Sequence, residues 1–252
     1  MVTTVPVPVE PAERFAQMLA DNLSAGVGGT LTWLNHYTAL QSMQAAVPLD
    51  RFDYVGLDGI LLCRLVHAEC ERTSADLVMP ALLARTSGLR IALIGSTEET
   101  LRTVAAKIEE QGDHRVVLIR DGYDGLPEPA VLRRQLREAR AQLVVVGLGA
   151  PRQDFYVLDL AMPGILVSTC GGWLDQYAGE SDYYPAWAYP LRLNWLVRLV
   201  REPRRLWRRY SIDGVRALRS RVALTEFVTG LGGEPLRASG GASVRTADQP
   251  AA

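Results

Sequence analysis

The chain has 252 residues, 48% of them hydrophobic, and a formal net charge of −1 at neutral pH. A chain of this length can bury one sizeable core, because the buried fraction of the surface rises with size. Its longest apolar runs fall far short of the ~20 residues that a membrane-spanning helix needs, so contact with a membrane is expected only from the side.

Cysteine and histidine are few and scattered. The three cysteines form no Cys-x-x-Cys pair, and the three histidines form no metal-binding cluster. We therefore predict neither a structural metal site nor a cofactor held by such residues. Unpaired cysteines without a recognisable signal peptide favour a cytoplasmic compartment.

The first predicted elements follow a proline-containing N-terminal arm, residues 1–11. Apolar residues at spacings of three and four predict a helix over 12–25, which glycines then interrupt. A short strand over 31–34 leads into a helix over 36–46. A second strand, 54–57, ends at Asp58-Gly59 and leads into a helix over 60–68.

The middle of the chain alternates most regularly. Strands are predicted over 90–94, 116–119, 143–146 and 165–168, with helices over 97–111 and 128–141, and Ser96 with Glu99 forms a predicted capping box. Strands that alternate with helices imply right-handed crossovers and a parallel sheet covered on both faces. We therefore expect an α/β, Rossmann-like core over residues 12–189.

The C-terminal region is basic. From Arg192 to Arg221 there are ten arginines against Glu202 and Asp213, interleaved with leucine and tryptophan. This pattern predicts a helical, amphipathic appendage over 190–229, which either meets an anionic ligand or membrane or packs on the core. Residues 230–252 have the composition of a disordered tail.

The stretch VVVGLGAPRQD, residues 144–154, carries two glycines at the end of a predicted strand. Arg152 stands where the dinucleotide pattern GxGxxG requires its third glycine, so binding of a nicotinamide cofactor is disfavoured. The alternative is a plain turn into a helix with Pro151 at the first helical position.

Several other polar residues follow predicted strands, where ligands bind in open parallel sheets. Asp58 could act as a general base or simply form a turn. Thr32 and Asn35 could orient a sugar or phosphate, or Asn35 could cap a helix. Asp175 could bind ribose hydroxyls or face solvent, and Arg72 could bind a diphosphate or lie on the surface.

Three stretches in order, GLGAPRQDFYV, CGGWLDQYAG and LNWLVRLVREPRRLWRRY, resemble the WecG/TagA/CpsF family of bacterial glycosyltransferases, glycosyltransferase family 26. The resemblance runs from about Leu31 to Tyr210. It implies a Rossmann-like, inverting, metal-independent transferase that acts at the cytoplasmic face of the plasma membrane in cell-surface polysaccharide or exopolysaccharide biosynthesis. The implied donor is a UDP-sugar of the N-acetylmannosamine, mannosaminuronate or glucose type, the acceptor is a polyprenyl-diphosphate-linked sugar, and a homo-oligomer is left open.

The same resemblance implies roles for individual residues. Asp58 matches the proposed base, and Thr32, Asn35 and Arg72 complete the catalytic set. The donor-binding set, with Tyr123 near the uracil and Asp175 near the ribose, is Gly95, Tyr123, Gly147, Gly149, Pro151, Gln153, Gly171, Gly172 and Asp175. The set expected near the acceptor diphosphate and the membrane is Arg198, Arg201, Arg204, Arg205 and Arg208.

This sequence also departs from the family pattern. Two residues separate Thr32 from Asn35 where the family commonly has one, and Asp154 replaces a usual glutamate. A different class of function, a non-catalytic nucleotide or nucleic-acid binder that uses the arginine-rich region, stays open as an alternative.

Overall fold

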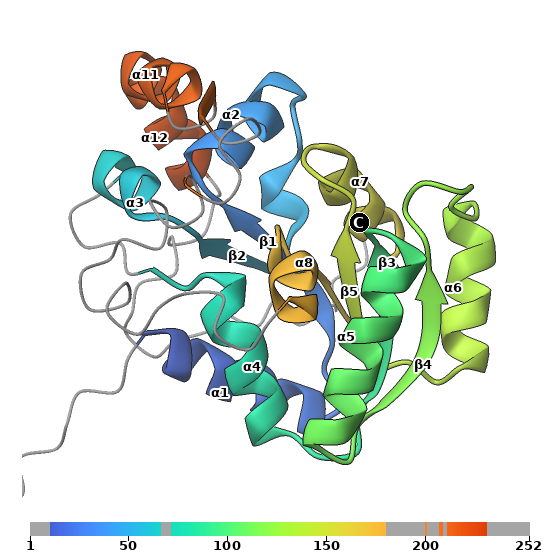
Figure 1. Cartoon of the computed structure of the whole chain (residues 1–252). Coiled ribbons are helices and arrows are strands. Elements are labelled where there is room, and N and C mark those ends of the chain that lie inside the picture. The colour runs from blue at the N-terminus through green and yellow to red at the C-terminus, as the bar shows by residue number, and fades with distance from the viewer. Residues whose placement is uncertain (1–10, 67–71, 180–199, 201–206, 209–210, 231–252) are drawn as a thin grey trace, which may run out of the picture.

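A computed structural model describes residues 11–66, 72–179, 200, 207–208 and 211–230. Its centre is a six-stranded sheet in the order β2-β1-β6-β5-β3-β4, in which every pair of neighbours is parallel (Figure 1). The predicted α/β class with a Rossmann-like parallel sheet is therefore confirmed. The strands are β1 (Gly29–Leu34), β2 (Tyr54–Leu57), β3 (Arg90–Gly95), β4 (Arg115–Arg120), β5 (Leu143–Gly147) and β6 (Leu166–Thr169).

Helices cover both faces of this sheet. One face carries α1 (Pro11–Ser24), α4 (Ala75–Arg85), α5 (Glu98–Gln111) and α8 (Trp173–Ala178), which lie in front of the sheet in Figure 1. The other carries α2 (His36–Gln44), α3 (Ile60–Val66), α6 (Pro129–Glu138), α7 (Arg152–Asp159), α11 (Ile212–Arg219) and α12 (Arg221–Thr229). A short 3-10 turn, η1 (Leu49–Arg51), precedes β2.

The continuous apolar runs of the central strands follow from this double cover. In β5, Leu143 and Val145 pack toward α1, α4, α5 and α8, whereas Val144 and Val146 pack toward the opposite helices. Successive side chains of a strand point to opposite faces, so a strand buried on both sides needs apolar residues at every position.

The chain leaves neighbouring strand ends toward opposite faces. β1 and β6 are adjacent, yet α2, which follows β1, and α8, which follows β6, pack on opposite faces of the sheet. In open parallel sheets, such a reversal opens a crevice outside the carboxyl ends of the strands. The fold therefore brings the loops after β1, β5 and β6 to one place.

Three local predictions need correction. Thr97, not Ser96, is the N-cap of α5, and its hydroxyl accepts a hydrogen bond from the backbone N–H of Thr100 at 3.2 Å. Ser96 has φ +49, so the chain is still turning after β3 and needs one more residue before the helix can start. Likewise Pro151 is the residue before the first helical position of α7, and α6 ends at Glu138 rather than at residue 141.

The described part of the predicted C-terminal appendage packs on the core. α11 contacts α2, α12 contacts α2 and α3, and three of their apolar side chains, Ala217, Leu224 and Val228, are buried there. The predicted arm, apart from Pro11, most of the segment 190–210 and the tail after Gly230 lie outside the described residues. Among the helices that the structure describes, none combines the length and hydrophobicity that crossing a membrane requires.

Candidate active site

A cavity of about 570 Å³ lies outside the carboxyl ends of β1, β2, β3, β5 and β6. Residues that follow each of these strands line it, together with side chains from α2, α8 and α11. A smaller polar pocket of about 40 Å³ adjoins it and shares Asp58, Ala75, Cys170 and Gly172. The cavity has the size and position of a small-ligand site in an open parallel sheet.

Glycines let the strand ends approach one another on one side of the cavity. A Cβ at Gly95, which has φ +108, would lie 2.2 Å from the backbone oxygen of Gly147. Gly149 has φ +78 and open space around its Cα, and it lines the cavity together with Gly147. A ligand can therefore approach this backbone closely, whereas Gly95 and Pro151 support the loop without lining the cavity.

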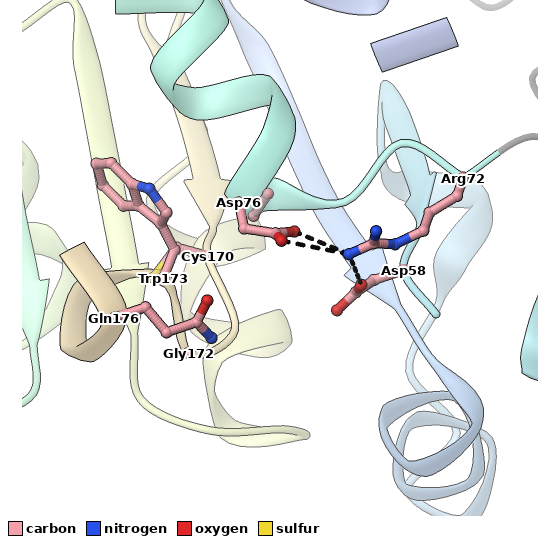
Figure 2. Close-up of a pocket in the computed structure, with 8 residues that line it drawn as sticks. Asp58, Arg72, Asp76, Cys170, Gly172, Trp173 and Gln176 are labelled. Carbon is pink, nitrogen blue, oxygen red and sulfur yellow. Dashed lines mark hydrogen bonds and ion pairs between the residues drawn. The ribbon is translucent and has the colours of Figure 1, made fainter. Parts of the chain in front are cut away.

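Asp58, Arg72 and Asp76 form a charged group at the small pocket (Figure 2). Nη2 of Arg72 lies 3.2 and 3.3 Å from the two carboxylate oxygens of Asp76 and 3.8 Å from Oδ1 of Asp58. Asp58 directly follows β2, and Asp76 belongs to the first turn of α4. The structure thus brings the predicted base and the predicted arginine together and adds a second carboxylate.

Asn35 and Thr32, although close in sequence, face different surroundings. Asn35 lines the cavity and also caps α2, because its Oδ1 accepts hydrogen bonds from the N–H groups of Tyr37 and Thr38 at 3.0 Å each. Thr32 is fully buried and donates its hydroxyl to Oδ1 of Asp154 at 2.6 Å. Thr32 therefore supports the floor of the cavity and does not itself line it.

Gln153 is buried, lines the cavity and has an unusual environment. Its Oε1 has no hydrogen-bond partner among the residues that the structure describes. Because a buried polar atom without a partner is costly, this oxygen is suited to accept a hydrogen bond from a ligand. This is the predicted glutamine of the GLGAPRQD loop.

The next residue, Asp154, is 1% exposed and lies below the cavity. Its carboxylate accepts hydrogen bonds from Thr32 and, at 3.3 Å, from the hydroxyl of Ser42. Burial raises the pKa of Asp154 above its ordinary value, and the two hydroxyl contacts oppose that shift in part. Asp154 thereby joins α7, β1 and α2 beneath the site.

The predicted nucleoside end of the site lies around Asp175. The hydroxyl of Ser96 donates to Oδ1 of Asp175 at 2.7 Å, and both residues line the cavity with Gly171 and Gly172. Tyr123 also lines the cavity, and this residue is 78% exposed. Asp121 holds the Tyr123 loop by accepting the backbone N–H of Tyr123 at 2.6 Å.

Arg208 is the one predicted acceptor residue within the described part of the chain, and it lines the cavity. Arg198, Arg201, Arg204 and Arg205 lie outside the described residues. From α11, Asp213 and Arg216 also line the cavity, with Nη1 of Arg216 at 3.3 Å from Oδ1 of Asp213.

Sequence reasoning missed several cavity residues. Tyr37, Thr38 and Gln41 line the cavity from α2, and their spacing after the cap at Asn35 places them on one face of that helix. Asp76 lies in the first turn of α4, whereas Arg72 precedes that helix, so the i,i+4 spacing of ion pairs on a helix does not by itself predict their contact. Cys170 lines both the cavity and the small pocket, and burial raises the pKa of its thiol to about 12.

A model of the glycosyl transferase WecG/TagA/CpsF family matches residues 2–228. The chain belongs to this family. The match spans all the residues that line the cavity and the small pocket, and the predicted family membership is confirmed. This member of the WecG/TagA/CpsF family is therefore a glycosyltransferase of cell-surface polysaccharide biosynthesis, and the cavity at the strand ends is its candidate active site.

Proposed function

We propose that this glycosyltransferase moves a sugar from a UDP-sugar to a polyprenyl-diphosphate-linked sugar, with inversion at the anomeric carbon and no metal ion in the chemical step. The observation that carries the proposal is the position of Asp58. Its carboxylate follows β2, borders both the cavity and the small pocket, and lies 3.8 Å from the guanidinium of Arg72. A carboxylate so placed can take a proton from a hydroxyl that enters the cavity.

The donor occupies the side of the cavity near β3, β5 and β6. The exposed ring of Tyr123 offers the uracil a stacking surface, and Asp175 accepts hydrogen bonds from the ribose. Oε1 of Gln153 accepts an N–H or O–H of the donor. The donor sugar is of the N-acetylmannosamine, mannosaminuronate or glucose type.

The acceptor diphosphate lies on the opposite side, near the C-terminal helices. Arg208 and Arg216 bring positive charge to the cavity, and guanidinium groups bind phosphate oxygens in two-point contacts. The four predicted arginines between residues 198 and 205 belong to the same proposed surface. Exposed apolar side chains on α11 and α12 would then face the membrane that holds the polyprenyl chain.

The reaction follows from these positions. Asp58 removes the proton from the acceptor hydroxyl as its oxygen forms a bond to the anomeric carbon, and the bond from that carbon to the oxygen of the β-phosphate breaks. UDP leaves with the electron pair of that bond. The backbone around Gly149 and the N-terminal end of α7 stabilise the charge on the departing diphosphate, together with arginine side chains.

The test is release of UDP from a panel of UDP-sugars with a short-chain polyprenyl-diphosphate sugar as acceptor, with and without EDTA. Asp58→Asn should lower kcat about 10²–10⁴-fold, because a positioned base contributes that much, while UDP binding stays near the wild-type level. Asp50→Asn, an exposed aspartate in η1, is the matched control and should keep full activity.

Other outcomes would contradict the proposal. Turnover by Asp58→Asn at the wild-type rate would exclude Asp58 as the catalytic base. Strongly salt-dependent binding of DNA or RNA with no UDP release from any donor would favour the nucleic-acid-binding alternative. Loss of turnover in EDTA that added Mg²⁺ restores would contradict metal independence.

A further inference from the structure

Arg72 contacts two carboxylates unequally. Its Nη2 reaches both oxygens of Asp76 at 3.2 and 3.3 Å, but Oδ1 of Asp58 only at 3.8 Å (Figure 2). The first two distances are those of long hydrogen bonds, whereas the third is an ion pair beyond hydrogen-bond distance. The guanidinium is thus held nearer to Asp76 than to the proposed base.

The backbones that carry Arg72 and Asp58 are held together independently of these side chains. The N–H of Thr73 donates to the oxygen of Leu57 at 2.9 Å, and the N–H of Leu57 donates to the hydroxyl of Thr73 at 3.2 Å. Leu57 precedes Asp58, and Thr73 follows Arg72. This pair of hydrogen bonds therefore sets the distance between the two backbones. Of the two carboxylates, only that of Asp76 lies within hydrogen-bond distance of Nη2 of Arg72.

Asp76 is itself firmly placed. It lies in the first turn of α4, which packs along α1, and its side chain is 19% exposed, against 32% for Asp58 and 30% for Arg72. Its negative charge is also favourable at a helix N-terminus. The most buried member of the group thus lines only the small pocket, whereas Asp58 also lines the larger cavity.

We propose that Asp76 is a positioning residue that holds the Arg72 guanidinium back from Asp58 and so keeps Asp58 effective as a base. This inference rests on the proposed function of Asp58. If the guanidinium closed to hydrogen-bond distance, it would stabilise the ionised carboxylate and occupy its lone pairs, and a carboxylate so paired accepts a proton less readily. Asp76 competes for the same guanidinium and limits that effect.

Other charged or titratable groups face the same region from the surrounding elements. They are Tyr37 from α2, Cys170 after β6, Asp175 from α8, Tyr123 after β4, Arg208, and Asp213 and Arg216 from α11. None of them is altered in an Asp76 variant, so a change specific to that variant reports on the Asp58–Arg72–Asp76 group.

The test is Asp76→Asn, which removes the charge with little change of shape. We expect kcat/KM at neutral pH to fall about tenfold, since part of the 10²–10⁴-fold contribution of the base is lost, and the acidic limb of the pH–rate profile to move to lower pH. Asp76→Glu should restore activity to within about threefold, because it keeps the carboxylate that holds Arg72.

Two controls separate positioning from a helix-stabilising role. Glu99→Gln removes an exposed acidic residue from the first turn of α5, and it should leave the pH–rate profile unchanged. In an Arg72→Ala background, Asp76→Asn should have no further effect on kcat/KM, because Asp76 acts through Arg72. An unchanged pH–rate profile in Asp76→Asn, or a full additional loss in the Arg72→Ala background, would overturn the proposal.

A crystal structure of Asp76→Asn tests the inference without any assay of transfer. We expect the distance between Nη2 of Arg72 and Oδ1 of Asp58 to shorten from 3.8 Å to hydrogen-bond distance. An unchanged distance would reject the positioning role of Asp76 even if UDP release is established. A shortened distance in a protein that releases no UDP would reject the proposed function and leave the competition for Arg72 established.

Discussion

Asp154, at 1% exposed, is more deeply buried than the carboxylates that line the cavity, and unlike the buried Asp213 it forms no ion pair with a described residue. Its hydrogen bonds come from two hydroxyl groups, and no ion pair to it occurs within the described part of the chain. Hydroxyl donors offset only part of the cost of burying a charge. Burial therefore raises its pKa from the ordinary 3.8, so folding favours the protonated form.

This shift predicts how stability depends on pH. The contribution of Asp154 to the free energy of unfolding is largest below pH 3.8 and is lost as pH rises through the raised value of the folded state. Asp154→Asn should therefore gain stability relative to the wild type as pH rises from 3.8 through the raised pKa of the folded state, by at most about 1.4 kcal/mol per pH unit within that interval. Urea unfolding measures this difference.

The control is Asp159→Asn, on the exposed side of the same helix α7. Its stability relative to the wild type should stay nearly constant over that pH range. If the free energy of unfolding of Asp154→Asn instead falls relative to the wild type as pH rises, the protein stabilises the charged carboxylate. That result would contradict a raised pKa for Asp154.

At the scale of elements, the candidate site depends on how closely β3 and β5 end beside one another. Gly95→Ala would place a Cβ 2.2 Å from the backbone oxygen of Gly147 at φ +108. Overpacking and backbone strain together should lower the free energy of unfolding by about 2–5 kcal/mol. The control is Gly125→Ala, at φ +67 in open space, which should lower the free energy of unfolding by only about 1 kcal/mol because of its φ angle. Urea unfolding measures both variants. Equal losses of stability would contradict the explanation by close approach of β3 and β5.

At the scale of the whole molecule, α11 and α12 have an inner face on the core and an outer face in solvent. Ala217 and Leu224 are buried, whereas Val215 is 48%, Leu218 55% and Val222 68% exposed. Arg216, Arg219 and Arg221 accompany these apolar residues on the same two helices. Such a surface is suited to an anionic membrane.

Co-sedimentation with vesicles that contain anionic lipid tests this surface. The double variant Val215→Glu with Leu218→Glu should weaken binding about tenfold or more, since it replaces apolar contacts with charges that the anionic leaflet repels. Val27→Glu, at another exposed valine (42%), is the control and should bind like the wild type. Equal binding by all three proteins would refute a membrane role for α11 and α12. The two helices would then serve only to pack their inner faces on the core.

Much of the architecture was predictable from local patterns. The strand over residues 54–57 matches β2, and the other predicted strands differ from the observed ones by one or two residues at one or both ends. Buried parallel strands appear in the sequence as continuous apolar runs that end at glycine or polar residues. The carboxyl ends of the strands could therefore be predicted from the sequence. The capping box at Ser96 failed because a left-handed turn residue cannot be distinguished from an N-cap serine by spacing alone.

The sequence by itself determined the family, the parallel α/β sheet and the loops that carry the candidate residues, because these depend on periodicity and on motifs within single loops. Only the tertiary structure decided which of those residues share a cavity. In the structure, the side chain of Thr32 contacts Asp154 and does not line the cavity, and Asp76 lies beside Arg72 and Asp58. The physical reason is that the face of a strand and the reach of a side chain are fixed by neighbours that lie far away in the chain.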